Sequence, residues 1–178
     1  WTNELIPNKF KDLTNDHPRM VIPFRDADGK VFAYQGRAFG EEQPKYITIV
    51  LDQNNQKIFG LDRVDDSRNI IIVEGPLDSL FLPNCIAVAQ GDLRLPQYKT
   101  KSTLVFDNEP RNREIIKNIE KAIEEDYNVV IWPSDIEEKD INDMIISGLT
   151  NVEITDIIHN NTFSGLEAKT QLSHWKKV

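Results

Sequence analysis

The chain has 178 residues, 39% of them hydrophobic and 28% charged, with a formal net charge of −8 at pH 7. A protein of this size and composition can bury one good core, or a large and a small lobe, which excludes a disordered chain. The single Cys85 and the three widely separated histidines exclude a disulfide framework and a zinc site, and an apolar run places Cys85 in the core. No apolar run approaches the roughly 20 residues of a membrane span, and the start WTNELIPNKF is not a signal peptide. We therefore expect a cytoplasmic protein with no membrane partner, and the start at Trp1 suggests a piece of a longer chain.

The acidic net charge argues against a nucleic-acid partner, because Lys and Arg carry phosphate binding. The charge is unevenly distributed, however. Residues 1–63 hold nine basic and nine acidic residues, whereas residues 64–178 hold twelve basic and twenty acidic ones. A neutral front region and an acidic back region suit an enzyme that handles a polyanion with a bound cation. For most of these acids, a solvated helix face is the simpler explanation.

Residues 19–61 have the pattern of a small, mostly β lobe that follows a polar lead-in over residues 1–18. Two β-type runs lie on either side of Asp26-Ala27-Asp28-Gly29, a turn composition that predicts a hairpin. The runs PKYITIVL and KIFGL predict further short strands. This lobe carries four cations on or beside its strands, and the simplest interpretation of each is a surface charge: Arg19, Arg25, Arg37 and Lys45.

The stretch NIIIVEGPLD, residues 69–78, is the pattern around which the rest is arranged. Four branched apolar residues, Ile70 to Val73, predict a fully buried strand of a parallel sheet. The strand stops at Glu74-Gly75-Pro76, and Asp78 follows one turn later in a short predicted helix, residues 77–81. Open α/β sheets build their sites at such strand ends. Taken by itself the pattern is weak, because a solvated acid at the rim explains it equally well.

An alternation of strands and helices follows. Apolar runs predict strands at residues 85–89, 103–106 and 128–133, and an apolar stripe of Ile115, Ile119 and Ile123 predicts a helix over residues 110–127. Further helices are predicted at residues 139–148, at 152–158 and from about 164. Strand, helix, strand in this order indicates parallel pairing with right-handed crossovers. The predicted fold class is therefore α/β, a parallel sheet flanked by helices and preceded by the small β lobe.

Acids also follow two later strands. Asp107-Asn108-Glu109 comes directly after one strand, and Asp140 follows the next. Because the carboxyl ends of parallel strands meet at one edge of a sheet, these carboxylates and Glu74 are expected to lie together and repel one another unless a cation neutralises them. Hard divalent cations such as Mg²⁺ or Mn²⁺ bind carboxylates together with substrate phosphates. The pattern predicts a divalent metal site at this edge.

The order and spacing of these motifs, with 33 residues from Glu74 to Asp107 and 33 from Asp107 to Asp140, resemble the Toprim domain of bacterial-type primases, topoisomerases and some nucleases. The front segment resembles the one that precedes Toprim in bacterial and bacteriophage replicative DNA primases, so the resemblance covers about residues 19–148. Two departures matter. Glu109 stands where the family has a second Asp, and Thr48 stands where an Asn is frequent, which weakens the case for a nucleotide contact there.

The resemblance implies metal-dependent, template-directed synthesis of short RNA primers. It assigns catalysis to Glu74, Asp107 and Glu109, and metal binding to these three together with Asp140; Glu74 is either a ligand or the general base. It also implies a division into an N-terminal nucleotide- and template-binding lobe (1–66), a Toprim domain (67–150) and C-terminal helices (151–178).

The front lobe would supply the contacts to substrate and template. By the resemblance, Arg37, Lys45 and Tyr46 lie near the incoming nucleoside triphosphate, and Arg19 and Arg25 face phosphates of a single-stranded DNA template. A replicative helicase is the expected protein partner.

Other functions remain open. A Toprim nuclease would use the same acids, but it is not expected to have the Arg37 and Pro44-Lys45-Tyr46 cluster. A topoisomerase needs a separate cleavage domain for which this chain has no room. A non-catalytic replication subunit would not need intact Glu74, Asp107 and Asp140.

Overall fold

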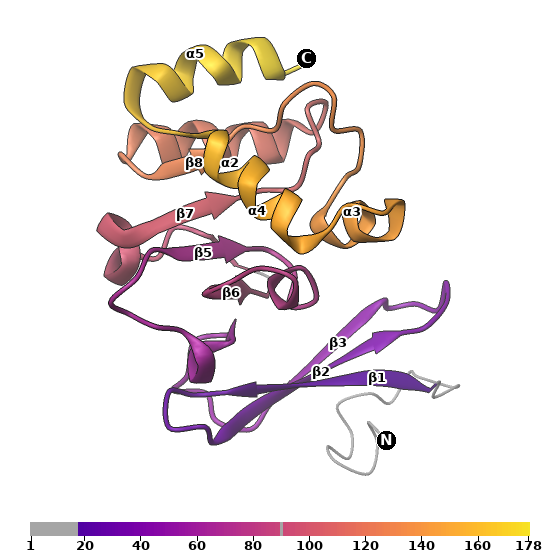
Figure 1. Cartoon of the computed structure of the whole chain (residues 1–178). Helices are drawn as coiled ribbons and strands as arrows, with labels where there is room; N and C mark the ends of the chain where they lie inside the picture. The colour runs from indigo at the N-terminus through magenta and orange to yellow at the C-terminus, as the bar shows by residue number, and fades with distance from the viewer. Residues whose placement is uncertain (1–17, 90) are drawn as a thin grey trace.

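The computed structural model describes residues 18–89 and 91–178. The predicted lead-in lies almost entirely outside these residues. The described chain begins with a three-stranded antiparallel sheet that forms a lobe of its own (Figure 1), made of β1 (Arg19–Arg25), β2 (Val31–Ala38) and β3 (Tyr46–Val50). The predicted hairpin joins β1 to β2. Its turn is closed by the Asp26 carboxylate, which accepts hydrogen bonds from the backbone N–H groups of Asp28 and Lys30, and by Gly29 at φ +80°.

A six-stranded sheet forms the larger part of the molecule. Its four inner strands run parallel, as predicted, while the two-residue strands at its edges run antiparallel to their neighbours. One edge strand, β4, comes from the KIFGL run, so the larger sheet takes this run from the region expected to form the front lobe. In spatial order the strands are β4 (Ile58–Phe59), β6 (Cys85–Val88), β5 (Ile70–Val73), β7 (Ser102–Val105), β8 (Asn128–Val130) and β9 (Thr162–Phe163).

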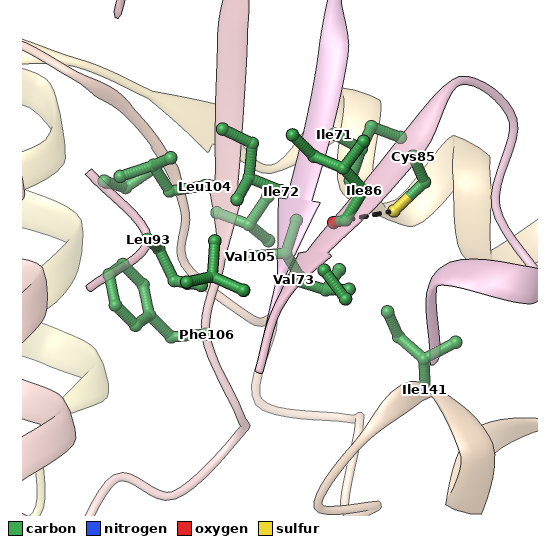
Figure 2. Packing of buried hydrophobic residues seen from close by; sticks show 14 of the residues in the cluster. Ile71, Ile72, Val73, Cys85, Ile86, Leu93, Leu104, Val105, Phe106 and Ile141 are labelled. Atoms are coloured by element: carbon green, nitrogen blue, oxygen red, sulfur yellow. Dashed lines mark hydrogen bonds between the residues drawn. The ribbon is translucent and has the colours of Figure 1, made fainter. Parts of the chain in front are cut away.

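The core is centred on β5, whose four residues are all buried. Figure 2 shows the β5 side chains packed beside Ile86 of β6 and Leu104 of β7. Burying branched side chains of this kind stabilises a fold by about 1.5–3 kcal/mol each. Phe106 and Ile141 belong to the same buried cluster. Each is adjacent in sequence to one of the predicted site acids, so the core fixes the backbone from which those acids project.

Cys85 is buried within β6, as predicted from the apolar run around it. Burial raises the pKa of its thiol, because the apolar surroundings disfavour the thiolate. A thiol held protonated in the core is a packing residue.

Helices cover both faces of the larger sheet, with α4 in front of it and α2 behind it in Figure 1. The stripe of isoleucines is buried along α2, which begins later than predicted because Asn112 caps its first turn. The helix predicted at residues 77–81 is a single 3₁₀ turn. The α-helices are α2 (Arg113–Glu124), α3 (Ile141–Ser147), α4 (Asn151–Asn160) and α5 (Gly165–Trp175), and the 3₁₀ turns are η1 (Leu61–Arg63), η2 (Asp78–Leu80) and η3 (Pro96–Lys101).

None of the helices within residues 18–89 and 91–178 combines the length and the apolar character needed to cross a bilayer.

Candidate active site

The predicted acids lie at the carboxyl end of the parallel strands of the larger sheet. Glu74 comes directly after β5, and Asp107 follows β7 after one buried residue, Phe106. Asp140 is the N-cap of α3, where its carboxylate accepts a hydrogen bond of 2.8 Å from the backbone N–H of Asp143. The sheet order places β5 and β7 side by side. The structure therefore brings together the acids that the strand pattern predicted to meet.

Asp78 is a further acid at this edge, one to which the sequence reasoning gave no role. Its Oδ1 accepts a 2.9 Å hydrogen bond from the backbone N–H of Asn142, at the start of α3. Its Oδ2 fills the space beside Gly75, where an added Cβ would lie only 2.1 Å from it. This close approach explains the glycine after Glu74, and the E-G-x-x-D spacing is the signal that could have identified Asp78.

Lys139 is the cation that the sequence reasoning missed. The Lys139 ammonium lies 3.7 Å from the carboxylate of Asp107 and 3.3 Å from that of Glu109. Sequence spacing does not reveal this contact, because Lys139 is distant in sequence from Asp107 and reaches the site through the loop before α3. Glu109 also accepts a 2.9 Å hydrogen bond from the Asn112 side chain.

Three of the carboxyl groups are held away from their ordinary pKa values. Burial, reinforced by the charges of Asp107 and Glu109, raises the pKa of Glu74 to about 7. Burial also raises the pKa values of Asp78 and Asp107 to about 6 each; Asp140 adds repulsion to both, and Lys139 partly offsets the shift of Asp107. A bound cation favours the charged form of these carboxylates, which burial and, to a lesser extent, mutual repulsion disfavour.

The donor set fits a hard divalent cation. A hollow of about 10 Å³ is lined by four of the carboxylate residues, Glu74, Asp78, Asp107 and Asp140. The Lys139 ammonium already bridges two of the site carboxylates as a cation would. Across residues 18–89 and 91–178, no three acid, histidine or cysteine side chains are arranged as a preformed ion site. Mg²⁺ needs only one or two carboxylates when waters and substrate phosphates complete its shell.

A cavity of about 590 Å³ joins these acids to the small sheet. Tyr46 lies within it, and the Lys45 ammonium and the Arg37 guanidinium each lie 5.8 Å from the centre of the Tyr46 ring. Burial raises the pKa of the Tyr46 hydroxyl, Arg37 opposes that shift, and the facing carboxylates reinforce it. The residues that line the cavity from both lobes include Gln35, Lys45, Tyr46, Glu74, Asp78, Asp107, Glu109, Lys139 and Asp140.

Of the four predicted front-lobe cations, only Lys45 lines this cavity; Arg37 lies beside the Tyr46 ring, and Arg19 and Arg25 lie elsewhere. Arg19 donates to the backbone carbonyls of Pro44 and Lys45, at 2.8 and 3.4 Å, and so supports the loop that carries Lys45. Arg25 is exposed and donates to the carbonyl of Gly29 in the hairpin turn. The two arginines lie at opposite ends of β1.

No protein-family model matches the chain, but the similar proteins and solved structures are DNA primases. The chain is 39% identical over 181 residues to the DNA primase of Enterobacteria phage T4, which covers 99% of this chain and 52% of the phage protein. It therefore spans about half the length of that relative.

Solved structures agree on the fold. The zinc-binding and RNA polymerase domains of the Aquifex aeolicus primase match with a TM-score of 0.62 and 23% identity, over 88% of this chain and 44% of that one. A DnaG primase catalytic domain bound to single-stranded DNA matches with a TM-score of 0.60 and 17% identity, over 81% of this chain and 52% of that one. The chain is thus a relative of the Toprim-type DNA primases and has the fold of their catalytic core.

Proposed function

We propose that this chain is the catalytic core of a DNA primase, an enzyme that joins ribonucleoside triphosphates into short RNA primers on a single-stranded DNA template. The observation that carries the proposal is the shared cavity, in which Asp107 and Glu74 lie opposite Lys45 and Tyr46. A nucleotidyl transfer needs acids that hold metal next to a cation that holds triphosphate, and this cavity contains both. The T4 relative is a DNA primase, and one solved neighbour is bound to single-stranded DNA.

The acids would carry the chemistry. Asp107, Glu109 and Asp140 would hold a divalent metal, Mg²⁺ or Mn²⁺, which when bound supplies activation of the 3′-hydroxyl and stabilisation of the leaving pyrophosphate. Glu74 is either a further ligand or the general base. Its pKa of about 7 suits a group that accepts a proton near neutral pH. Lys139 would release Asp107 and Glu109 on metal binding and could then face phosphate.

The front lobe would hold the substrates. Lys45 and Tyr46 line the cavity, and Arg37 contacts Tyr46, so these three are assigned to the incoming nucleotide. Arg19 and Arg25 are assigned to template phosphate outside the cavity, where charge and forked donors matter more than base reading. Residues 1–66 would then be the substrate-binding lobe, residues 67–150 the Toprim domain and residues 151–178 a C-terminal helical part, with a replicative helicase as partner.

Extension of a short RNA primer annealed to a DNA template tests the chemistry without requiring initiation. With Mg²⁺ or Mn²⁺ and nucleoside triphosphates, the wild type should extend the primer, and Asp107→Asn should do so on the order of 100-fold more slowly or worse. Asp156→Asn removes an exposed acid of α4 and should have wild-type activity. Undiminished extension by Asp107→Asn would contradict the metal assignment, and cleavage of the DNA strand in place of extension would indicate a nuclease.

A further inference from the structure

Asn108 lies between two of the proposed metal ligands, yet it lines a different cavity. Asp107 and Glu109 line the candidate active site, whereas Asn108 lines a second cavity of about 550 Å³ together with Trp175. The side chains of this turn therefore alternate between the two cavities. The contacts of Asn108 are to the loop before α3 and to the end of α5.

Asn108 holds the loop that brings Lys139 and Asp140 to the site. Its backbone N–H donates a 2.6 Å hydrogen bond to the carbonyl of Lys139. Its side-chain Nδ2 donates to the carbonyls of Ile136 and Glu138, at 2.9 and 3.0 Å. Three hydrogen bonds thus tie the turn after β7 to residues 136–139. Asn108 therefore joins the two halves of the proposed metal site by hydrogen bonds, beside the ion pairs of Lys139 with Asp107 and Glu109.

The side-chain oxygen of Asn108, Oδ1, accepts a hydrogen bond from the end of the last helix, α5. The Trp175 indole N–H donates a 3.1 Å hydrogen bond to Oδ1. Two residues later, the Lys177 backbone N–H donates a 2.8 Å hydrogen bond to the carbonyl of Pro110. The end of α5 is therefore attached to the chain on both sides of Glu109. All the hydrogen-bonding groups of the Asn108 side chain are used, which fixes its amide plane in one orientation.

We propose that Asn108 and Trp175 are positioning residues, which hold the Asp107 turn and the Lys139–Asp140 loop in register so that metal affinity depends on α5. The proposal rests on the proposed function only in taking these acids as metal ligands. Partners one shell out from a metal commonly govern its affinity because they orient the ligands. Trp175 is 8% exposed and Leu172 is 3% exposed, so α5 is anchored in the core and can act as a fixed support.

The test is a Mn²⁺ titration of the nucleotide-free chain, followed by electron paramagnetic resonance of the free ion. Trp175→Phe retains an aromatic ring but removes the N–H. It should weaken Mn²⁺ binding by about tenfold. In primer extension, the Mn²⁺ concentration for half-maximal rate should rise by the same factor, while the KM for nucleoside triphosphate at saturating Mn²⁺ should stay unchanged.

Two comparisons separate positioning from loss of stability. Leu172→Ala loosens α5 but leaves the Trp175 hydrogen bond, so it should lower the Tm and leave Mn²⁺ affinity within twofold of wild type. In an Asn108→Ala background, Trp175→Phe should cause no further weakening, because Asn108→Ala already removes the acceptor of the Trp175 N–H. Additive losses, or equal weakening by Leu172→Ala, would overturn the proposal. If the wild type binds Mn²⁺ but does not extend primers, the proposed function fails, and the binding data alone test the inference. If the wild type binds no Mn²⁺, both fail.

Discussion

At the scale of single residues, the two lysines of the candidate site differ in their partners. Lys139 pairs with Asp107 and Glu109 on the sheet edge, while Lys45 faces the cavity from the other lobe and no ion pair is found for it among the described residues. A compact ammonium exposed in this way suits a triphosphate. The two lysines therefore have different parts, one as partner of the acids and one as a substrate contact.

Replacing Lys45 by alanine should raise the KM for nucleoside triphosphate more than it weakens single-stranded DNA binding. One charged hydrogen bond is worth about 1.5–3 kcal/mol, so the KM should rise about tenfold or more. Steady-state extension kinetics and a fluorescence DNA titration measure the two effects. Lys30→Ala removes an exposed lysine beside the hairpin turn, so it is the matched control and should leave both the KM and DNA binding unchanged. Loss of DNA binding alone in Lys45→Ala would move this residue to the template.

At the scale of elements, the turn from β5 into η2 is held by close packing and by a hydrogen bond to α3. The Asp78 carboxylate packs against Gly75 and is held there by the N–H of Asn142, so the start of η2 is tied to the start of α3. A side chain at position 75 has no room unless Asp78 moves, and moving Asp78 breaks that link.

Gly75→Ala should therefore destabilise the fold by about 1–3 kcal/mol and reduce Mn²⁺ affinity, because the added Cβ displaces Asp78. Urea unfolding and Mn²⁺ titration give the two quantities. Gly148→Ala is the control. Gly148 ends α3 at φ +109° with open space around it, so alanine there costs about 1 kcal/mol through backbone strain but should leave Mn²⁺ binding unchanged. Equal Mn²⁺ affinity in both variants would show that Asp78 does not shape the metal site.

At the scale of the whole molecule, the net charge of −8 and the crowded acids set how the protein responds to pH, metal and salt. Glu74, Asp78 and Asp107 have folded-state pKa values of about 7, 6 and 6, above the values near 4 of an unfolded chain. Between these limits the folded state binds more protons than the unfolded state. Stability is therefore lost as the pH rises.

In EDTA, the Tm should consequently fall as the pH is raised from about 4 to about 7, apart from the general effect of net charge. Millimolar MgCl₂ should restore much of the loss at pH 7 and little at pH 5, because the ion binds only ionised carboxylates. Thermal melts at each pH with and without Mg²⁺ provide the measurement. The Asp107→Asn variant should show a shallower decline in EDTA, since it removes one of the repelling charges. A Tm that rises through this pH range in EDTA would mean that the acids are not crowded in solution.

The isolated chain should bind single-stranded DNA weakly. Its front region has no net charge, and few cations are available for phosphate, so the Kd should lie near the non-specific range of roughly 10⁻⁴ to 10⁻⁶ M and rise steeply with salt. We also expect inefficient de novo primer synthesis without partner proteins. Titration of a fluorescent single strand at two salt concentrations decides the first point. Sub-micromolar binding that is insensitive to salt would contradict it.

The amino-acid sequence by itself determined the parallel strands, α2 and the acids at the strand ends. Runs such as Ile70–Val73 and stripes such as Ile115, Ile119 and Ile123 are local patterns, and a strand end is visible where such a run stops. The motif order also led to the primase resemblance, which the T4 relative bears out.

Tertiary structure decided the contacts between segments that are far apart in the chain. It placed Lys139 between Asp107 and Glu109 and paired β4 with β6 of the larger sheet. It also brought Trp175 to Asn108, which lies 67 residues earlier in the chain. Sequence periodicity records which face of an element is buried, but not which distant element covers it. Those partners follow from how the elements pack, because only the packed fold brings these polar groups within hydrogen-bonding distance.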